Sequence, residues 1–367
     1  MKPSDSAHHS SKLTSCNRRT VLRGIAGSIA PALIASTDAF ADATRGVSLA
    51  AAESGNTQHE LTHRTVSVNG LRFHIAESGQ GPLVLLCHGF PECWYSWRHQ
   101  LHALAEAGFH AVAPDMRGFG QTEAPDDTAE YTLVHNIADM VQLVSVLGEQ
   151  QAVIVGHDWG APVAWISAQL RPDIFRAVVA MSVPYRARQP VAPLKALRDA
   201  GTTNFYWLYF QTPGVAEAEL ERDVDRTVRT LLYGTGVSLM LKPGQGFLED
   251  TTIPEQSPSW LTGEDISYFV ETYKRTGYRG GLNWYRNIDR NWELSGAWEG
   301  LKVQQPALFI AGSEDPVIKF AAKPLEQLPT TVPGLKKTLI MPNSGHWIQQ
   351  QRPAEVNAAI LEFLRPA

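Results

Sequence analysis

The residues with the clearest potential for chemistry lie around Asp158. Four apolar residues, 152–155, precede Gly156-His-Asp-Trp-Gly160, and a helix-like run follows from Ala161 to Leu170. Glycines two positions before and after Asp158 allow the sharp strand-to-helix turn that exposes a nucleophile. A carboxylate is already ionised at neutral pH, so it can attack an electrophilic carbon without a base to remove a proton. The pattern predicts that Asp158 is a nucleophile and that the intermediate is an alkyl-enzyme ester.

Hydrolysis of such an ester needs a base, and the end of the chain offers one. His346 lies in Ser344-Gly-His-Trp347, after the last expected strand, and can activate water. Asp315, at the end of the preceding strand, can orient the imidazole, with its neighbour Glu314 as the alternative acid. The order Asp158, Asp315, His346 is a known order of the nucleophile–acid–histidine triad.

Two backbone N–H groups are expected to complete this site. Ester hydrolysis builds negative charge on a carboxyl oxygen of Asp158, and amide donors aimed at that oxygen stabilise the transition state. His88-Gly-Phe-Pro-Glu92 directly follows an apolar strand, so its loop should meet the Asp158 turn. The predicted donors are the backbone N–H groups of Phe90 and Trp159. His157 is expected to be a structural neighbour whose side chain points away from the reacting groups.

Strand-like and helix-like runs alternate along most of the chain, which is typical of an α/β domain with a mainly parallel sheet. Asn69-Gly70 predicts a tight hairpin at one edge of the sheet. Residues 184–298 interrupt the alternation and are expected to form a helical cap inserted after the sixth strand, between core segments 63–183 and 299–367. The eight expected strands cover residues 65–69, 71–77, 83–87, 110–114, 152–155, 177–182, 307–311 and 337–341.

Composition excludes several classes of function. The 367 residues carry a formal net charge of −5 without a long basic run, which gives no support for a nucleic-acid surface. Three cysteines imply no disulfide framework. Gly118-Phe-Gly120 lacks the third glycine of a dinucleotide fingerprint, so no cofactor is expected. His99 and His102 lie one helical turn apart without an acidic ligand nearby in sequence, and no metal site is expected.

The first 41 residues have the pattern of a secretion signal. Arg18-Arg19 precede a weakly apolar stretch that ends at Ala39-Phe-Ala41, a small-x-small cleavage pattern. This resembles a twin-arginine signal and predicts export to the periplasm or the extracellular space. The apolar stretch is too short to span a bilayer, so no stable membrane anchor is expected. Residues 42–62 are expected to be a flexible lead-in.

From about Thr62 onward the chain resembles the epoxide hydrolases of the α/β-hydrolase fold, and is similar to the hydrolase domain of soluble epoxide hydrolases. The resemblance covers core and cap, and it implies an epoxide as substrate. The aromatic residues of the expected cap suggest an apolar pocket and therefore a small, lipophilic epoxide. The segments that carry it are His88-Gly-Phe-Pro, Asp115-Met-Arg-Gly-Phe-Gly120, Gly156-His-Asp-Trp-Gly160, Phe210-Gln-Thr-Pro-Gly214, Leu282-Asn-Trp-Tyr-Arg286 and Gly345-His-Trp347.

The resemblance implies that two cap tyrosines, Tyr206 and Tyr285, hydrogen-bond the epoxide oxygen. Phenols suit this task because epoxide opening releases an alkoxide, a poor leaving group that needs a proton. Tyr206 lies in an aromatic run, and Tyr209 in the same run is the alternative first donor.

Two other functions compete with this one. A haloalkane dehalogenase also uses an aspartate nucleophile followed by tryptophan, but its halide product needs N–H donors rather than proton donation. A binding protein on the same fold would be expected to lack the nucleophile, the acid or the histidine. Serine esterase chemistry is excluded at this turn because position 158 is aspartate.

Overall fold

The computed structural model describes residues 60–365 and contains one eight-stranded sheet with the strand order β1-β2-β4-β3-β5-β6-β7-β8. β1 and β4 each pair with β2 antiparallel, and every other neighbouring pair is parallel. The predicted eight-stranded, mostly parallel sheet is confirmed. The leader expected at residues 1–41 lies outside the described residues, as does the lead-in up to residue 59. The strands are β1 Thr62–Val68, β2 Leu71–Ser78, β3 Leu83–Cys87, β4 His110–Pro114, β5 Ala152–His157, β6 Phe175–Met181, β7 Ala307–Gly312 and β8 Leu335–Met341.

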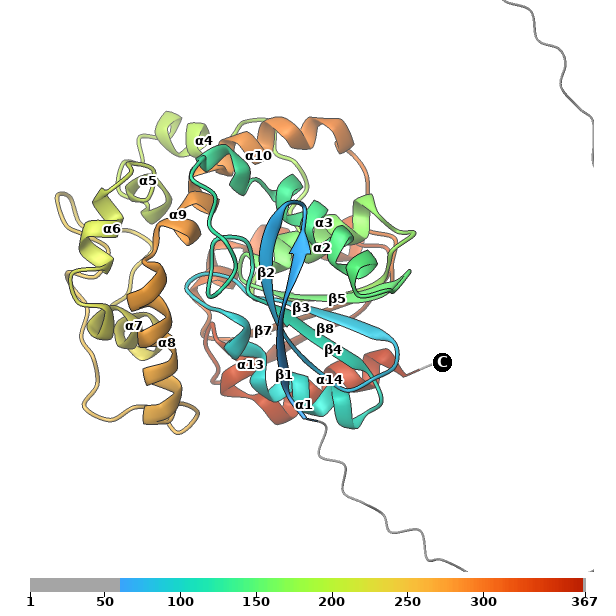
Figure 1. Cartoon of the computed structure of the whole chain (residues 1–367). Helices are drawn as coiled ribbons and strands as arrows, with labels where there is room; N and C mark the ends of the chain where they lie inside the picture. The colour runs from blue at the N-terminus through green and yellow to red at the C-terminus, as the bar shows by residue number, and fades with distance from the viewer. Residues whose placement is uncertain (1–59, 366–367) are drawn as a thin grey trace, which may run out of the picture. The chain divides into compact units, whose positions relative to one another are not determined.

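Helices cover both faces of the sheet, which explains why the central strands are apolar throughout (Figure 1). Successive residues of β3 alternate between two buried clusters. Leu85 packs in the cluster that includes Met140 of α2, whereas Leu86 packs in the cluster that includes Leu101 of α1 and Ile360 of α14. The helices around the sheet are η1 Trp94–Trp97, α1 Arg98–Glu106, η2 Thr128–Tyr131, α2 Leu133–Val146, α3 Gly160–Leu170, α11 Pro316–Phe320, α12 Ala322–Thr331, α13 Ile348–Gln351 and α14 Pro353–Leu364.

The hairpin predicted at Asn69-Gly70 is present at the β1 edge. Both residues have positive φ, 47° and 82°, as a two-residue hairpin turn requires, and Val68 pairs with Leu71 across it. β1 begins at Thr62, three residues before the predicted start at Thr65. The missed residues are polar and exposed, because an edge strand needs no apolar face to stay paired.

The segment between β6 and β7 is helical and lies beside the sheet (Figure 1). We call residues 184–298 the inserted segment. Its helix α8 is fixed to the loop that follows β3, since the Tyr273 hydroxyl donates to the carbonyl of Glu92 and the Trp94 indole N–H donates to Tyr268. The helices of the segment are α4 Pro193–Asp199, α5 Tyr206–Tyr209, α6 Val215–Leu220, α7 Val224–Tyr233, α8 Gly263–Thr276, α9 Arg279–Arg286, α10 Ile288–Leu294 and η3 Ser295–Trp298.

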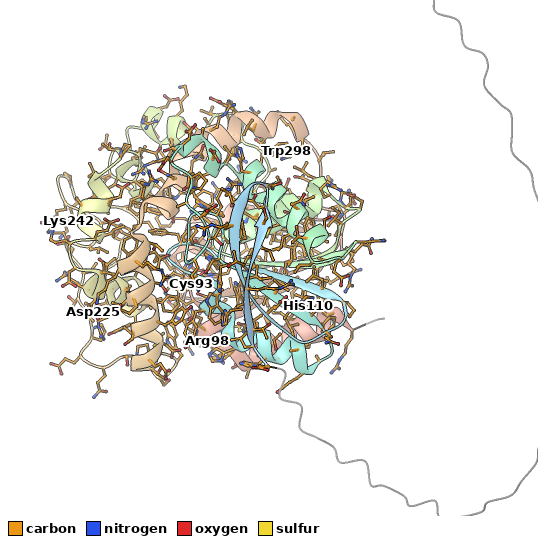
Figure 2. The ribbon with its side chains drawn as sticks, in the orientation of Figure 1. Cys93, Arg98, His110, Asp225, Lys242 and Trp298 are labelled. Carbon is orange, nitrogen blue, oxygen red and sulfur yellow. The ribbon has the colours of Figure 1, made fainter. Side chains whose placement is uncertain are left out.

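An ion pair also joins α8 to the sheet domain. Arg98 Nε lies 3.0 Å from Asp265 Oδ1, and both side chains are largely buried. Arg98 and Cys93 lie where the inserted segment meets the sheet, while Asp225 and Lys242 lie on the outer side of that segment (Figure 2). Between residues 60 and 365, no helix has the length and apolar character needed to cross a membrane.

Candidate active site

The predicted strand–turn–helix around Asp158 is present at the carboxyl end of β5. Asp158 has φ 50°, in the left-handed region that few residues other than glycine adopt, between the end of β5 at His157 and the start of α3 at Gly160. A methyl group on Gly156 would overlap the backbone of Gly160, and one on Gly160 would overlap the carbonyl of Cys87. The two glycines are therefore required for the close packing that holds Asp158 in this conformation.

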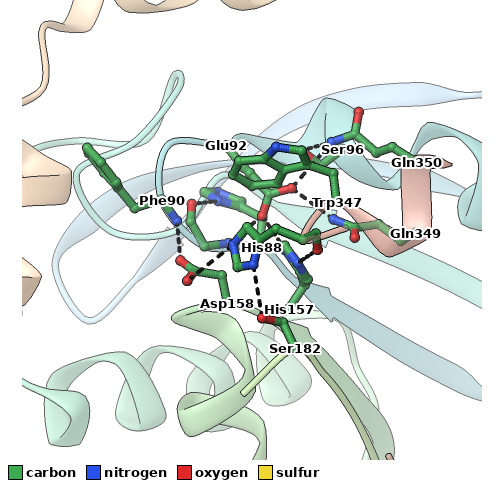
Figure 3. A network of polar contacts seen from close by, with 12 residues as sticks. His88, Phe90, Glu92, Ser96, His157, Asp158, Ser182, Trp347, Gln349 and Gln350 are labelled. Atoms are coloured by element: carbon green, nitrogen blue, oxygen red, sulfur yellow. Dashed lines mark hydrogen bonds and ion pairs between the residues drawn. The ribbon is translucent and has the colours of Figure 1, made fainter. Parts of the chain in front are cut away.

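Two backbone amides hydrogen-bond the Asp158 carboxylate. The N–H of Phe90 donates to Asp158 Oδ1 over 2.8 Å (Figure 3), and the N–H of Trp159 also hydrogen-bonds this carboxylate. Gly89 lies so close that any side chain there would collide with the carboxyl group. Burial raises the pKa of Asp158, while the charge of His346 and the two N–H groups act in the opposite direction. The structure thus brings both predicted N–H donors to the predicted nucleophile.

His346 faces the other oxygen of Asp158. Its Nε2 lies 3.6 Å from Asp158 Oδ2, and its Nδ1 lies 3.1 Å from Asp315 Oδ1. Burial would lower the pKa of His346, but the charge and hydrogen bond of Asp315, together with Asp158, raise it to about 9. The side chains of Asp158 and His346 are 13 % and 16 % exposed, so neither is completely shielded from solvent.

The structure assigns the place next to the imidazole to Asp315. Its carboxylate is fully buried, and the pKa is held below its ordinary value because His346 and Ser182 outweigh the effect of burial. Glu314, the alternative acid, is exposed and pairs with Lys319. Ser182 was not predicted, although its Oγ lies 3.0 Å from His346 Nδ1. Nothing in the local sequence distinguishes this serine at the end of β6 from other small polar residues.

A buried polar network behind the site was also missed (Figure 3). Glu92 Oε2 lies 2.7 Å from His157 Nδ1 and accepts the N–H of Gly89, while Glu92 Oε1 accepts Gln349 Nε2 over 2.8 Å. The second ring nitrogen of His157 lies 2.7 Å from the carbonyl of His346. Burial alone would raise the pKa of Glu92, but the charge and hydrogen bond of His157, the charge of His88 and the N–H of Gly89 lower it to about 2.

This network, which we call the Glu92 network, connects the loop of Phe90, the turn of Asp158 and the loop of His346. The expectation that His157 points away from the reacting groups agrees with its bond to Glu92. The network therefore holds together the three loops that carry Phe90, Asp158 and His346.

Two tyrosines of the inserted segment lie on the open side of Asp158. The Tyr285 ring lies 5.5 Å from the Phe90 ring and 5.1 Å from the Trp159 ring, between centroids, and the Tyr206 ring lies 5.7 Å from Tyr285. The side chains of Tyr206 and Tyr285 also hydrogen-bond each other. Burial raises the pKa of both phenols, so both keep their protons at neutral pH.

Tyr209 is directed elsewhere. Its hydroxyl donates to Glu219 Oε2 over 2.8 Å, within the inserted segment. Of the two tyrosines that the sequence left open as the first donor, the structure brings Tyr206 to the site. The choice depends on tertiary packing, because both residues belong to the short helix α5.

Comparisons with known proteins agree with this arrangement. The profile of the alpha/beta hydrolase fold family matches residues 82–353. Epoxide hydrolase A of Mycobacterium tuberculosis is 43 % identical over 314 residues, which is 83 % of this chain and 97 % of that protein. Bifunctional epoxide hydrolase 2 of Sus scrofa is 39 % identical over 83 % of this chain and 55 % of its own length.

Solved structures give the same result. The crystal structure of epoxide hydrolase A from Mycobacterium thermoresistibile superimposes with a TM-score of 0.80 at 42 % identity, over 83 % of this chain and 98 % of that one. The chain therefore belongs to the α/β hydrolase family and, within it, to the epoxide hydrolases.

Proposed function

We propose that this enzyme adds water to an epoxide to give a vicinal diol, through an ester on Asp158 and without a cofactor. The observation that carries the proposal is the pairing of Asp158 with two phenols. Tyr285 packs against both residues whose N–H groups bind the carboxylate, and its side chain hydrogen-bonds that of Tyr206. The names of the relatives support the same reaction.

In the first half-reaction, Asp158 Oδ2 attacks an epoxide carbon. The Asp158–carbon bond forms as the carbon–oxygen bond of the ring breaks, and the released oxygen takes a proton from Tyr206 or Tyr285. Oδ1 stays bound to the N–H of Phe90, so it becomes the carbonyl oxygen of the ester. Because the negative charge on the epoxide oxygen develops in the transition state, the phenols accelerate opening more than they strengthen binding.

In the second half-reaction, His346 acts as the base. Esterification removes the negative charge of Asp158, which is one of the groups that raise the pKa of His346 to about 9. That pKa therefore falls in the ester, and the neutral imidazole takes a proton from water. The resulting hydroxide adds to the ester carbonyl, and the charge on Oδ1 is stabilised by the N–H groups of Phe90 and Trp159. Collapse of this adduct expels the alkoxide, which takes the proton from His346 to give the diol, and leaves Asp158 as a carboxylic acid. Asp158 then loses its proton, and the phenolate formed in the first half-reaction regains one, so the enzyme returns to its starting state.

The inserted segment is proposed to act as a cap over the substrate. Its contribution to the site is aromatic: Phe210 lies 5.0 Å and 5.5 Å from the Tyr285 and Tyr206 rings, and Phe247 stacks on Tyr206 at 5.7 Å. Such surroundings favour a lipophilic epoxide.

Dehalogenase activity is the alternative to test. A halide leaves as a stable anion and gains little from phenolic protons, which is why the tyrosine pair favours the epoxide. Purified protein should be incubated with aryl and fatty-acid epoxides and, in parallel, with haloalkanes of matched size, and both diol and halide should be measured. We expect diol from at least one epoxide class and no enzymatic halide release, and neither product from Asp158→Asn. Faster halide release than diol formation would overturn the proposal.

We also propose that the protein is exported. The support is Arg18-Arg19 ahead of a weak apolar stretch and a small-x-small site ending at Ala41.

A further inference from the structure

A pair of histidines on the edge hairpin faces a surface pocket of about 420 Å³ that is separate from the active site. His63 of β1 pairs with Ala76, and His74 of β2 pairs with Thr65, so the histidines are diagonal neighbours on one face of an antiparallel pair. His63 Nδ1 lies 3.1 Å from His74 Nε2, and the Gln121 side-chain amide lies 3.3 Å from the same nitrogen.

The tautomer of His74 is determined by Asp115. His74 Nδ1 lies 2.8 Å from Asp115 Oδ2, which also accepts the N–H of Gln121, while Oδ1 accepts the N–H of Trp94. A carboxylate that receives these bonds is an acceptor, so His74 Nδ1 carries the ring proton. Nε2 therefore presents its lone pair to the pocket. Histidines that bind metal ions usually donate the N–H of their other ring nitrogen to a carboxylate or carbonyl, as His74 does here.

We propose that His63 Nδ1, His74 Nε2 and the Gln121 amide oxygen form a site for a divalent transition-metal ion such as Zn²⁺. Zn–N bonds are about 2.0–2.1 Å long. Two nitrogens bound to the same ion are therefore about 2.9 Å apart when the N–Zn–N angle is about 90°, and about 3.4 Å apart when the angle is tetrahedral. The observed 3.1 Å lies between these values. His63 is exposed and can turn its ring toward a shared ion, and a flip of the Gln121 amide brings its oxygen to the present place of nitrogen.

The ligand set determines which metals fit. Two imidazoles and an amide suit Zn²⁺, Cu²⁺ or Ni²⁺, whereas Mg²⁺ and Ca²⁺ prefer oxygen ligands. No cluster of three or more His, Cys, Asp and Glu side chains in residues 60–365 is arranged to hold a metal. The proposed site has only two ligands of these residue types, His63 and His74, and depends on Gln121 and water for the others. We therefore expect the bound metal ion to exchange with free metal ions in solution.

Binding at this site would stabilise the edge of the sheet. An ion bound by both His63 and His74 would link β1 to β2 through their side chains, in addition to the hydrogen bonds between the two backbones. His74 also bonds Asp115, whose other oxygen holds Trp94, two residues beyond Glu92. The metal-bound protein should therefore unfold at a higher temperature than the metal-free protein.

The test is a Zn²⁺ titration of the full-length chain, monitored by calorimetry. The background carries His8→Ala, His9→Ala and Cys16→Ser, which removes other metal-binding side chains near the N-terminus. We expect one equivalent of Zn²⁺ to bind and to raise the melting temperature, and Co²⁺ to give visible bands of a nitrogen-ligated ion. His63→Ala should weaken binding by at least about tenfold and abolish the melting shift, and Gln121→Ala should weaken binding less.

His102→Ala is the matched control, because His102 is also exposed and has a second histidine, His99, one turn away. This variant should bind Zn²⁺ like its parent. Circular dichroism of metal-free His63→Ala establishes that the variant is folded. Equal Zn²⁺ affinity in His63→Ala and His102→Ala, or no uptake by the parent, would overturn the proposal. Neither outcome depends on whether the enzyme opens epoxides.

Discussion

At the scale of single residues, the two oxygens of Asp158 have different surroundings. Oδ1 accepts the N–H of Phe90, and Oδ2 faces His346 Nε2 at 3.6 Å. This asymmetry allows one oxygen to attack while the other later carries the negative charge of hydrolysis. It also places His346 between two carboxylates, Asp158 and Asp315, which is why its pKa is raised to about 9 although burial lowers it.

The pH dependence of the two half-reactions follows from these charges. Ester formation requires ionised Asp158, so its rate should fall as the pH drops through the pKa of Asp158, which burial raises. Ester hydrolysis requires neutral His346, so its rate should rise with pH and level off above the pKa of His346 in the ester, which lies below about 9. Single-turnover tryptophan fluorescence across the pH range separates the steps. A hydrolysis rate independent of pH would contradict the role of His346.

The cap tyrosines give a second prediction at this scale. Tyr206→Phe and Tyr285→Phe should each slow epoxide opening at a cost of about 2–4 kcal/mol, as for loss of one oxyanion donor, with a smaller effect on substrate binding. The double variant should open little or no epoxide. Tyr209→Phe is the control: it loses the bond to Glu219, worth about 1 kcal/mol of stability, and should keep the opening rate. The rate of epoxide opening is measured by pre-steady-state kinetics on an aryl epoxide. If the double variant opens the epoxide at the rate of the parent, the assignment of Tyr206 and Tyr285 as proton donors is contradicted.

At the scale of elements, a buried network connects three of the loops that carry the site, those that follow β3, β5 and β8. The Glu92 network joins them: Glu92 contacts the Gly89 N–H, His157 and Gln349, and His157 contacts the His346 carbonyl. Such a buried network rigidifies the loops when every member is satisfied.

Replacing Glu92 by Gln should destabilise the fold by about 3–5 kcal/mol at neutral pH, as expected when a buried charge loses its partner. The pKa of Glu92 is about 2 in the folded state, below its ordinary value of 4.5, so the stabilisation is present above pH 4.5 and lost between pH 4.5 and 2. The variant should therefore lose less stability than the parent on acidification in this range. Urea unfolding at neutral pH and at about pH 3 measures both effects. The exposed Glu106→Gln is the control and should change neither.

Much of the site could be predicted from local patterns, and the remainder depends on tertiary contacts. β3 and β4 have the predicted bounds, because a short apolar run between turn residues identifies a buried strand. Asp158 and His346 were found because each follows a strand in a recognisable short motif. Ser182 and the Glu92 network were missed because their partners lie far away in the sequence and only the folded sheet brings them together.

At the scale of the whole molecule, the sheet brings the proposed triad together at the carboxyl ends of its parallel strands. The triad groups follow β5, β7 and β8, at the carboxyl ends of parallel strands, and the inserted segment supplies the tyrosines from between β6 and β7. The relatives named above match 83 % of the chain. The proposal of export depends only on residues 1–41, outside the described residues.

Export can be tested with the arginine pair alone. Arg18→Lys together with Arg19→Lys keeps the positive charge but removes the guanidinium groups that define a twin-arginine signal. We expect the double variant to remain unprocessed in the cytoplasm while the parent is exported and cleaved after Ala41. Fractionation and mass spectrometry of the mature N-terminus give the result. Export and cleavage of the Lys-Lys variant would show that the signal is of another type.

The central claim, that Asp158 and not water attacks the substrate, is tested by one isotope measurement. Enzyme in excess over a single portion of epoxide is allowed one turnover in heavy-oxygen water, and both the diol and the peptide that contains Asp158 are analysed by mass spectrometry. If an ester forms and water attacks its carbonyl carbon, the heavy oxygen enters the Asp158 carboxylate and the first diol contains none. Heavy oxygen in the first diol, with an unlabelled Asp158 peptide, would mean that water opens the epoxide directly and would contradict the account.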